Sequence, residues 1–230
     1  MTAGTLREIR DETPDVKTFV IEVSDVSFVP GQYCLVSLPG SSDDSRPFTF
    51  ANSPTLKGVV ELTVKKMGRF TSALFGLRAG DIIEVGPAMG SALNYDESAD
   101  AVFLAGGSGI TPFMSALRYA KAKKIKRSLI LIYSNRTEKD IIYRTELEGL
   151  SRIGNLTVVN TLSDGGWAGE TGRISRALVE KYVKDPCDRL WYICGPPPMT
   201  AAMKAMLEDL GIPKEKWRYE DWEIPGKNDG

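Results

Sequence analysis

The residues of this chain that could do chemistry are glycine, arginine, hydroxyl and thiol groups, because none of its 230 residues is histidine. The absence of histidine excludes a Ser-His-Asp or Cys-His hydrolase, a His-ligated zinc or haem, and imidazole acid–base catalysis. The cysteines Cys34, Cys187 and Cys194 stand far apart, without a C-x-x-C pair. We therefore expect no disulfide framework, metal site or iron–sulfur cluster, and chemistry borrowed from an organic cofactor.

A glycine-rich turn, Gly106–Pro112, directly follows the apolar run Ala101–Ala105. Glycines permit positive φ and close backbone approach, and exposed amides at a helix start attract phosphate oxygens. We predict Thr111 as the helix N-cap and Pro112 as the first helical residue. Because a true Rossmann fingerprint has glycine or alanine at Pro112, a plain strand–helix turn stays open beside a dinucleotide-binding turn.

A second turn, Cys194–Met199, follows the apolar run Leu190–Ile193. Ligands of parallel sheets bind outside the carboxyl ends of the strands, so we expect both turns on one edge. Its Gly-Pro-Pro-Pro stretch stiffens the backbone where a flat ligand could pass. For Cys194 itself, a buried core thiol is the alternative interpretation.

The first half carries an R-P-F-T run that starts at Arg46. Strand alternation predicts Arg46, Phe48 and Phe50 on one face and Thr49 on the other. An arginine and an aromatic ring suit a phosphate and a flat ring system, and the hydroxyl could reach a ring nitrogen. The Gly68–Ser72 segment indicates a further anion site at a helix start. The alternative is an ordinary half-buried strand with an exposed arginine.

The elements that must position these motifs follow two different sequence patterns, and the change of pattern divides the chain at residue 97. Residues 1–97 read as short strands broken by turns, with one helical stretch, which predicts an antiparallel β-barrel. The strand runs are Thr18–Val23, Tyr33–Leu38, Val59–Lys65 and Asp81–Val85, and the helical stretch is Thr71–Phe75.

Residues 98–230 alternate apolar runs with amphipathic segments, which predicts an α/β doubly wound parallel sheet. The predicted strands are Ala101–Ala105, Ser128–Tyr133, Leu156–Val159 and Leu190–Ile193, and the predicted helices are Pro112–Ala122, Tyr143–Leu150, Ser175–Tyr182 and Met199–Leu210. The acidic stretch Asn94–Asp100 is the predicted linker.

Composition narrows the class of partner. The chain is 42% hydrophobic and 26% charged, with a net charge of −1, which excludes a disordered chain and disfavours nucleic acid. No apolar run approaches the roughly 20 residues that span a bilayer, and the first residues contain no signal-peptide h-region. We expect a cytoplasmic protein without a membrane span.

Ordered motifs along nearly the whole chain resemble the ferredoxin–NADP reductase-like flavoproteins, including flavohaemoglobin-type and oxygenase reductase domains. They are P-G-Q-Y at Pro30–Tyr33, R-P-F-T at Arg46–Thr49, G-x-x-T at Gly68–Thr71, Gly80–Pro87, G-G-S-G-I-T-P at Gly106–Pro112, C-G-P-P-P-M at Cys194–Met199, and Tyr219–Trp222. Iron–sulfur cysteines of fused or multi-subunit relatives are absent from the sequence.

The resemblance implies an FAD-binding barrel, with FAD favoured over FMN, and an NAD(P)-binding sheet domain. It implies catalytic roles for Thr49, Cys194 and Glu220. The flavin contacts would be Arg46, Pro47, Phe48, Thr49, Asn52, Gly68, Thr71, Ser72 and Trp222. The nicotinamide nucleotide contacts would be Gly107, Ser108, Gly109, Thr111, Pro112, Ser134, Arg136, Cys194, Gly195 and Pro196. The sequence departs from the family pattern at Asn52, which replaces a serine, at Phe48, which replaces a tyrosine, and in the polar tail after Trp222.

The implied function is hydride transfer from NADPH or NADH to the flavin, followed by electron transfer to a separate acceptor. That acceptor would be a ferredoxin or flavodoxin, steered by Lys65, Lys66, Arg69 and Arg78, or a small molecule. Ser134 and Arg136, without an acidic residue at the strand end, favour NADPH. The alternatives are an electron-transfer component of a larger redox complex, a nucleotide-sensing module without turnover, and an inert scaffold.

Overall fold

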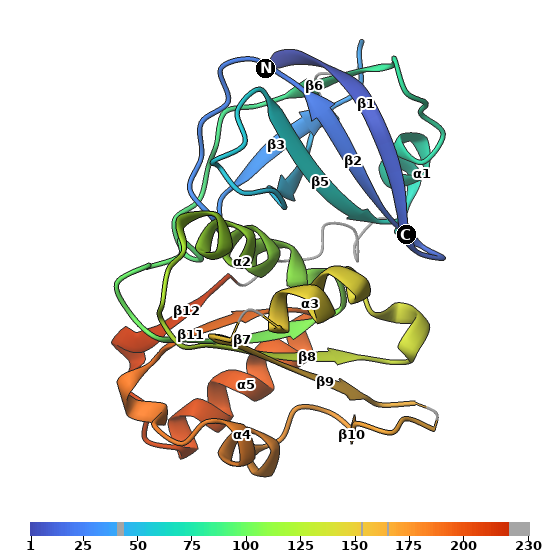
Figure 1. Ribbon diagram of the computed structural model, residues 1–230. Helices are drawn as coiled ribbons and strands as arrows, with labels where there is room; N and C mark the ends of the chain where they lie inside the picture. The colour runs from blue at the N-terminus through green and yellow to red at the C-terminus, as the bar shows by residue number, and fades with distance from the viewer. Residues whose placement is uncertain (41–43, 153, 165, 221–230) are drawn as a thin grey trace.

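An antiparallel barrel and a parallel sheet stack end to end, with helix α2 lying between them (Figure 1). The computed structural model describes residues 1–40, 44–152, 154–164 and 166–220. Both the order of the two domains and their strand directions confirm the fold class predicted from the sequence. The domain boundary at residue 97 stays a prediction.

The barrel is a six-stranded antiparallel sheet in the order β4-β3-β6-β1-β2-β5. A bridge between Phe50, just beyond β4, and Leu62 of β5 joins the two ends of this order and closes the barrel. Its core is apolar, and the Phe28 and Phe50 rings stack within it at 4.1 Å. The elements are β1 Thr2–Thr13, β2 Val16–Glu22, β3 Tyr33–Ser37, β4 Arg46–Thr49, β5 Val59–Lys65, α1 Arg69–Leu74 and β6 Ile82–Val85.

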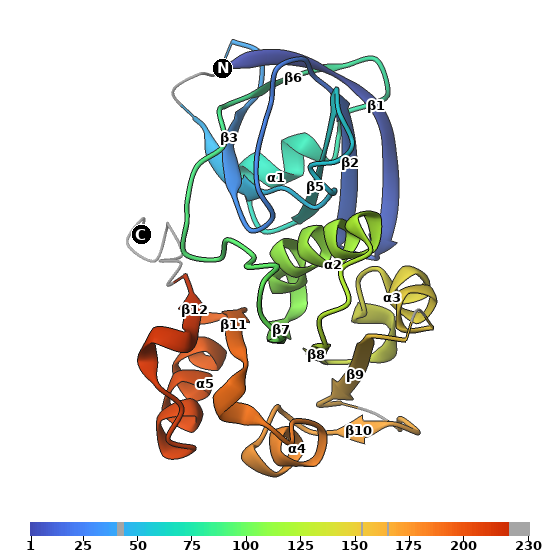
Figure 2. The same cartoon turned by 60° about the vertical axis from the view of Figure 1, so that its left-hand side comes forward.

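The second sheet is parallel, in the order β10-β9-β8-β7-β11-β12. Helices α2 and α3 cover the face toward the barrel, and α4 and α5 cover the far face (Figure 2). Each face has its own apolar cluster, which is why the central strands are buried on both sides. The strands are β7 Ala101–Gly106, β8 Leu129–Asn135, β9 Leu156–Leu162, β10 Glu170–Thr171, β11 Leu190–Cys194 and β12 Trp217–Tyr219. The helices are α2 Thr111–Lys123, α3 Arg144–Ser151, α4 Arg176–Tyr182 and α5 Pro197–Asp209, with short 3₁₀ turns at Gly107–Ile110, Glu138–Asp140, Pro186–Asp188 and Lys214–Lys216.

Three strands, β1, the two-residue β10 and β12, had no counterpart in the sequence-based prediction. β1 escapes the alternation rule because its register with β2 shifts between Leu6 and Glu8 and again between Asp11 and Thr13. The three-residue β12 forms only by parallel pairing with β11, a long-range contact that leaves no local pattern.

The predicted cap of α2 was wrong. Thr111 is the first helical residue rather than the N-cap, because the 3₁₀ turn Gly107–Ile110 leads directly into the helix. The Thr111 hydroxyl instead donates to the Ser108 carbonyl at 2.8 Å, inside that turn. Among the described residues, no helix is long and apolar enough to cross a bilayer.

Candidate functional site

The barrel presents an arginine and an aromatic ring on one face of β4, as the alternation predicted. The Arg46 guanidinium carbon lies 5.8 Å from the centroid of the Phe70 ring, and the Phe48 ring stacks on the same ring at 6.0 Å. Phe70 comes from α1, so this short helix supports both side chains. Arg46 is exposed and Phe48 is half-buried, which leaves a charge and a flat surface within reach of a ligand. Phe50, the third residue predicted on this face, is fully buried in the barrel core.

An acidic residue already pairs with the cations of this site. Asp44 binds Arg46 at 2.8 Å and Arg69 at 3.5 Å through its two carboxylate oxygens. These pairs are partly exposed, so each contributes little to stability. Asp44 therefore orients the two guanidinium groups. A phosphate that binds Arg46 would either share the guanidinium with the Asp44 carboxylate or displace that carboxylate.

The hydroxyl of Thr71 organises the loop that precedes α1. Its Oγ1 accepts from the Met67 amide at 2.8 Å and donates to the Gly68 carbonyl at 3.2 Å. Ser72, the next residue, is exposed. Thr71 thus shapes the loop through bonds within the chain, whereas Ser72 lies open to solvent.

Pro47 and Thr49 are both half-buried, and the ladder between β3 and β4 pairs Thr49 with Tyr33. Asn52 is fully buried, and its amide is engaged within the barrel. Its Nδ2 donates to the Val59 carbonyl, and its Oδ1 accepts from the Glu61 amide, both at 2.9 Å. Asn52 therefore pins the chain after β4 to β5, and a side-chain contact from it to a flavin stays a prediction.

In the parallel sheet, the turns after β7 and β11 meet at backbone contact distance. A Cβ added to Gly109 would lie 2.2 Å from the Cys194 carbonyl oxygen, and one added to Gly106 would lie 2.4 Å from the Met199 sulfur. At Gly109, where the facing atoms belong to the backbone, only glycine allows this approach. The two predicted turns therefore share one edge of the sheet.

One residue of the first turn faces outward. Gly107 has a φ of +53°, which favours glycine, and the position of its missing Cβ meets no atom within 4 Å. The Tyr133 hydroxyl donates to the Gly107 carbonyl at 2.9 Å and fixes its direction. Around it, Ser108, Gly109 and Gly195 are half-buried, Thr111 and Pro112 are buried, and Pro196 is exposed.

Cys194 lies at the end of β11 and is 7% exposed. Burial, with a smaller contribution from the negative charge of Glu220, raises the pKa of its thiol to about 12. The group is therefore a neutral thiol near pH 7 and not a ready nucleophile. Burial also raises the pKa of the Glu220 carboxyl.

Glu220 lies between the two domains, near Tyr33 of the barrel and close enough to Cys194 for its charge to act on the thiol. A Cβ on Gly90 would lie 2.7 Å from the Tyr33 ring and 3.3 Å from Glu220 Oε1, so this carboxylate reaches β3. Because Tyr33 pairs with Thr49, the barrel and sheet contributions come to the same junction.

At the end of β8, Ser134 is half-buried and Arg136 is exposed. Arg136 Nε lies 3.2 Å from the Asp164 carboxylate, just past the end of β9. At the predicted site for a 2′-phosphate, the cation Arg136 is thus solvent-exposed at the carboxyl ends of the strands and already paired with Asp164. Trp222 lies outside the described residues.

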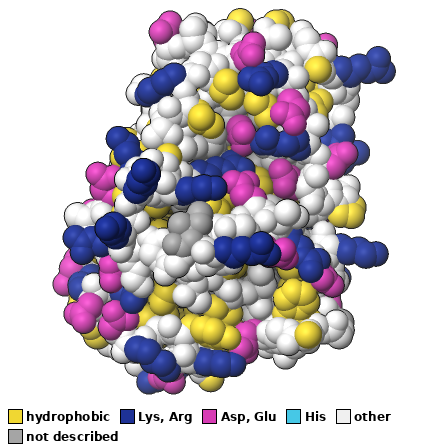
Figure 3. Space-filling model, viewed as in Figure 1, with side chains coloured by type: hydrophobic (Ala, Val, Ile, Leu, Met, Phe, Trp, Pro, Cys, Tyr) yellow, Lys and Arg dark blue, Asp and Glu magenta, His cyan; other side chains and the backbone are white. Residues whose placement is uncertain are grey.

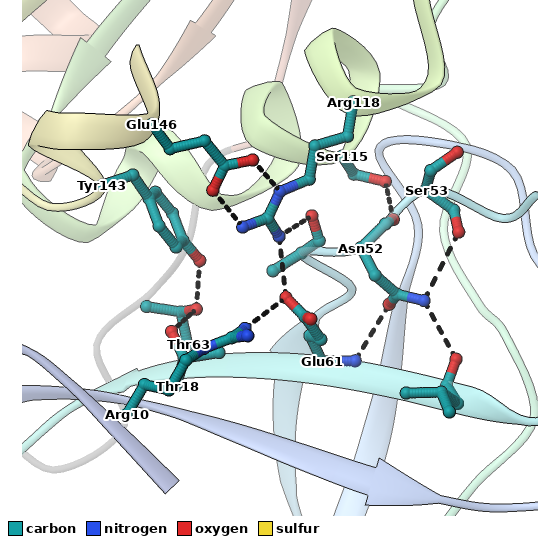
Figure 4. Close-up of polar contacts among 12 residues, drawn as sticks. Arg10, Thr18, Asn52, Ser53, Glu61, Thr63, Ser115, Arg118, Tyr143 and Glu146 are labelled. Carbon is teal, nitrogen blue, oxygen red and sulfur yellow. Dashed lines mark hydrogen bonds and ion pairs between the residues drawn. The ribbon is translucent and has the colours of Figure 1, made fainter. Parts of the chain in front are cut away.

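Sequence reasoning missed a polar cluster between the domains, shown in Figure 4, which is buried or nearly buried except at Arg10 and Glu146. We call it the junction cluster, and its members are Arg10, Thr18, Ala51, Asn52, Glu61, Thr63, Ser115, Arg118, Tyr143 and Glu146. Apart from Asn52, no local motif marks these residues, because they come from segments of both domains that lie far apart in the sequence. Arg118 on an amphipathic helix looks like an ordinary solvent-facing residue until the barrel packs against it.

Comparison with known families agrees with this geometry. A family model described as an oxidoreductase FAD-binding domain matches residues 3–93, and one described as an oxidoreductase NAD-binding domain matches residues 103–205. The chain belongs to the ferredoxin–NADP reductase-like flavoproteins. Its barrel is therefore an FAD-binding domain and its parallel sheet an NAD-binding domain.

Curated relatives and solved structures match most of the length of this chain. The F subunit of the Na(+)-translocating NADH-quinone reductase of a Marinomonas species is 31% identical over 198 residues, which cover 77% of this chain and 48% of that protein. The chain thus spans about half the length of the curated relatives it matches. The crystal structure of an Amycolatopsis cytochrome P450 reductase has a TM-score of 0.85 at 25% identity, covering 96% of this chain and 69% of that one. The FAD/NAD-binding domain of a Vibrio cholerae nitric oxide dioxygenase has a TM-score of 0.87 at 19% identity, covering 96% and 98%, and shows the shared fold.

Proposed function

We propose that this protein is an NAD(P)H-dependent flavoprotein reductase. It takes hydride from NADPH or NADH onto FAD held by the barrel and passes electrons to a separate acceptor. The observation that carries this proposal is the junction where Tyr33 of the barrel, the ladder partner of Thr49, comes close to Glu220 of the sheet domain, whose charge acts on Cys194. A cofactor from each domain would meet there.

The residues present fit both cofactors. The exposed Arg46 and the half-buried Phe48 offer a charge for a phosphate and a surface for a flat ring. Gly107 faces open space beside a helix that begins at Thr111, as a pyrophosphate requires. Bound FAD supplies the hydride-accepting ring, and the chain supplies binding, orientation and exclusion of water.

The roles of the chain follow from its contacts. Thr49 would orient the flavin ring by a hydrogen bond from its hydroxyl. Cys194, as a neutral thiol, and Glu220 would line the path of the nicotinamide ring without acting as strong bases. Hydride transfer requires reacting atoms about 3–3.5 Å apart and aligned, so positioning accounts for most of the catalysis. A chain without histidine is suited to such a reaction.

The acceptor is proposed as another protein, with ferredoxin or flavodoxin as candidates and a small molecule as the alternative. Lys66 and Arg78 are exposed near α1, beside Lys65 and Arg69. Lys65 and Arg69 already pair with Asp15 and Asp44, at 3.0 and 3.5 Å. Figure 3 shows acidic and basic side chains interspersed over one face, so any steering would come from a local excess near α1.

A second candidate is an electron-transfer component of a larger redox complex. It is favoured by the relatives named as the F subunit of a Na(+)-translocating NADH-quinone reductase. These proteins are about twice as long as the matched region, so their acceptor and assembly do not transfer directly to this chain. Co-purification with partners at constant stoichiometry from the native host would support the complex; a protein that turns over alone with added acceptors would support the reductase.

The test of the leading proposal is anaerobic reduction. The protein is loaded with FAD, freed of excess flavin, and mixed with NADPH or NADH without oxygen. We expect the visible flavin absorption to bleach within the catalytic time scale, and to return when an acceptor is added. Tight binding of both nucleotides without bleaching would contradict the reductase and support a sensing module.

A further inference from the structure

The junction cluster connects α2 to the segment that follows β4 of the barrel. Ser115 Oγ donates to the Asn52 carbonyl at 2.7 Å, and Arg118 Nη1 donates to the Ala51 carbonyl at 2.9 Å (Figure 4). Ser115 and Arg118 are three residues apart and therefore share one face of the helix. Two consecutive carbonyls of the barrel are thus bound by two neighbouring side chains of the sheet domain.

Each end of this connection lies close to a cofactor site. Ala51 follows Thr49 by two residues, and its own amide donates to the Glu61 carbonyl at 2.8 Å. On the other side, Ser115 lies about 6 Å along the helix from Thr111, at a rise of about 1.5 Å per residue. Thr111 in turn closes the glycine turn through its bond to Ser108. Hydrogen bonds and one helix therefore link the two sites.

Arg118 is held from three directions. Its guanidinium binds both oxygens of Glu146 in α3, at 2.8 and 2.6 Å, and Glu61 of β5 at 2.8 Å. It also lies over the Tyr143 ring, 5.0 Å from the centroid. The Arg118 side chain is 15% exposed and that of Glu61 is 12% exposed. Burial lowers the pKa of Arg118, but the hydrogen bond to Glu146 and the charges around the guanidinium, those of Glu146 and Glu61 among them, outweigh burial and raise the pKa above its ordinary value, so the group stays charged.

A buried charge network of this kind is weak evidence for stability, because desolvation offsets much of the attraction. The network does fix the position of one domain relative to the other, because a relative shift of one hydrogen-bond length would leave charges and carbonyls without partners. The observation therefore indicates a device for orientation.

On the basis of the function proposed above, we propose that Ser115 and Arg118 are positioning residues for hydride transfer. They act through α2 and the Ala51 and Asn52 carbonyls, and they set the approach of the nicotinamide site to the flavin site. Both residues act at a distance from the cofactors rather than by touching them.

The test compares Arg118→Met with Arg189→Met in FAD-loaded protein. Arg189 is a matched control, because its side chain is 8% exposed and binds Asp185 at 2.7 and 3.0 Å wholly within the sheet domain. We expect Arg118→Met to slow the limiting rate of flavin reduction at saturating coenzyme by about 10²-fold, as a misplacement of about 1 Å does. The dissociation constants of FAD and coenzyme should change little. Arg189→Met should keep the wild-type rate at a comparable loss of thermal stability.

Two further variants keep the test decisive if Arg118→Met folds poorly. Ser115→Ala removes one bond and should slow reduction by about tenfold, and Arg118→Lys keeps the charge but not the fork and should fall between Met and wild type. Equal rates for Arg118→Met and Arg189→Met, or a loss confined to coenzyme binding, would overturn the positioning role.

Hydrogen–deuterium exchange gives a readout that does not depend on turnover. In FAD-loaded protein without coenzyme, Arg118→Met should speed exchange at both residues 50–53 and 107–111, and Arg189→Met at neither. If wild-type protein is not reduced by either coenzyme, the proposed function fails while this coupling can still be observed. If wild-type protein is reduced but the two segments do not respond together, only the present inference fails.

Discussion

The two cofactor sides of this molecule are built by different means. On the sheet side, Gly109 leaves no room for a Cβ against the backbone of Cys194 and Gly195, so backbone contact fixes the shape. On the barrel side, the shape comes from side chains, with Asp44 holding Arg46 and Phe70 supporting Phe48. Changes at the tight glycine turn of the sheet side should therefore act in an all-or-none manner, whereas changes on the barrel side should weaken binding by degrees.

The largest expected effect is the difference in thiol reactivity between buried Cys194, in the tight turn of the sheet side, and an exposed cysteine. With a pKa of about 12, Cys194 should react with iodoacetamide near pH 8 about 10³-fold more slowly than an ordinary exposed thiol. Exposed Cys187 provides the internal reference, and buried Cys34, whose pKa burial also raises to about 12, should behave like Cys194. Because the thiolate is the reactive form, labelling of Cys194 should rise as the pH rises toward 12. Peptide mass spectrometry gives the rates, and equal labelling of all three thiols would refute the tight turn.

Gly109→Ala should nearly abolish flavin reduction. The new methyl group would lie 2.2 Å from the Cys194 carbonyl oxygen, 2.5 Å from its carbon and 2.8 Å from the Gly195 nitrogen, all backbone atoms. Forcing the turns apart should cost about 1–3 kcal/mol of unfolding free energy and displace the coenzyme. Gly149→Ala in α3, where a Cβ meets nothing within 4 Å, is the control and should stabilise by about 0.5–1 kcal/mol. Urea unfolding measures the stability of the two variants, and single-turnover kinetics measure their rates of flavin reduction. A Gly109→Ala protein that reduces its flavin at the wild-type rate would contradict a rigid sheet side.

Arg46→Ala should weaken FAD binding by degrees. Loss of a charge-assisted hydrogen bond to phosphate is worth about 1.5–3 kcal/mol, or about 10- to 100-fold in the dissociation constant. Arg7→Ala, which removes a surface arginine paired with Glu22 at 3.7 Å, is the control and should leave the constant unchanged. Flavin fluorescence titration of the apoprotein measures this, and equal constants for both variants would exclude Arg46 from the site.

Arg136→Ala should give the smallest effect, a rise of up to about tenfold in the KM for NADPH with no change for NADH. The effect is limited because Arg136 is 82% exposed and already pairs with Asp164. Asp164→Asn should lower the KM for NADPH, since it frees the guanidinium. Steady-state kinetics give the KM for each coenzyme. Equal changes in the KM for NADPH and for NADH would contradict the assignment of Arg136 to the 2′-phosphate.

The same contrast explains what the sequence could predict. The glycine turns were readable because backbone geometry constrains residue type locally, as at Gly106–Pro112. Arg46 and Phe48 were readable from strand alternation. Ser115 and Arg118 were not, because their partners Asn52 and Glu61 lie more than fifty residues earlier in the chain and only tertiary packing brings them together. The bulges of β1 likewise removed the signal that alternation needs.

The most direct test of the central claim is a single-turnover reaction of FAD-loaded protein with NADH or NADPH deuterated at the transferred position. We predict that the flavin absorption bleaches in one phase, and that the deuterated coenzyme slows this phase because the hydride moves directly between rings at the domain junction. Bleaching without any isotope effect in a phase shown to be chemical, or no bleaching with both nucleotides bound, would contradict it.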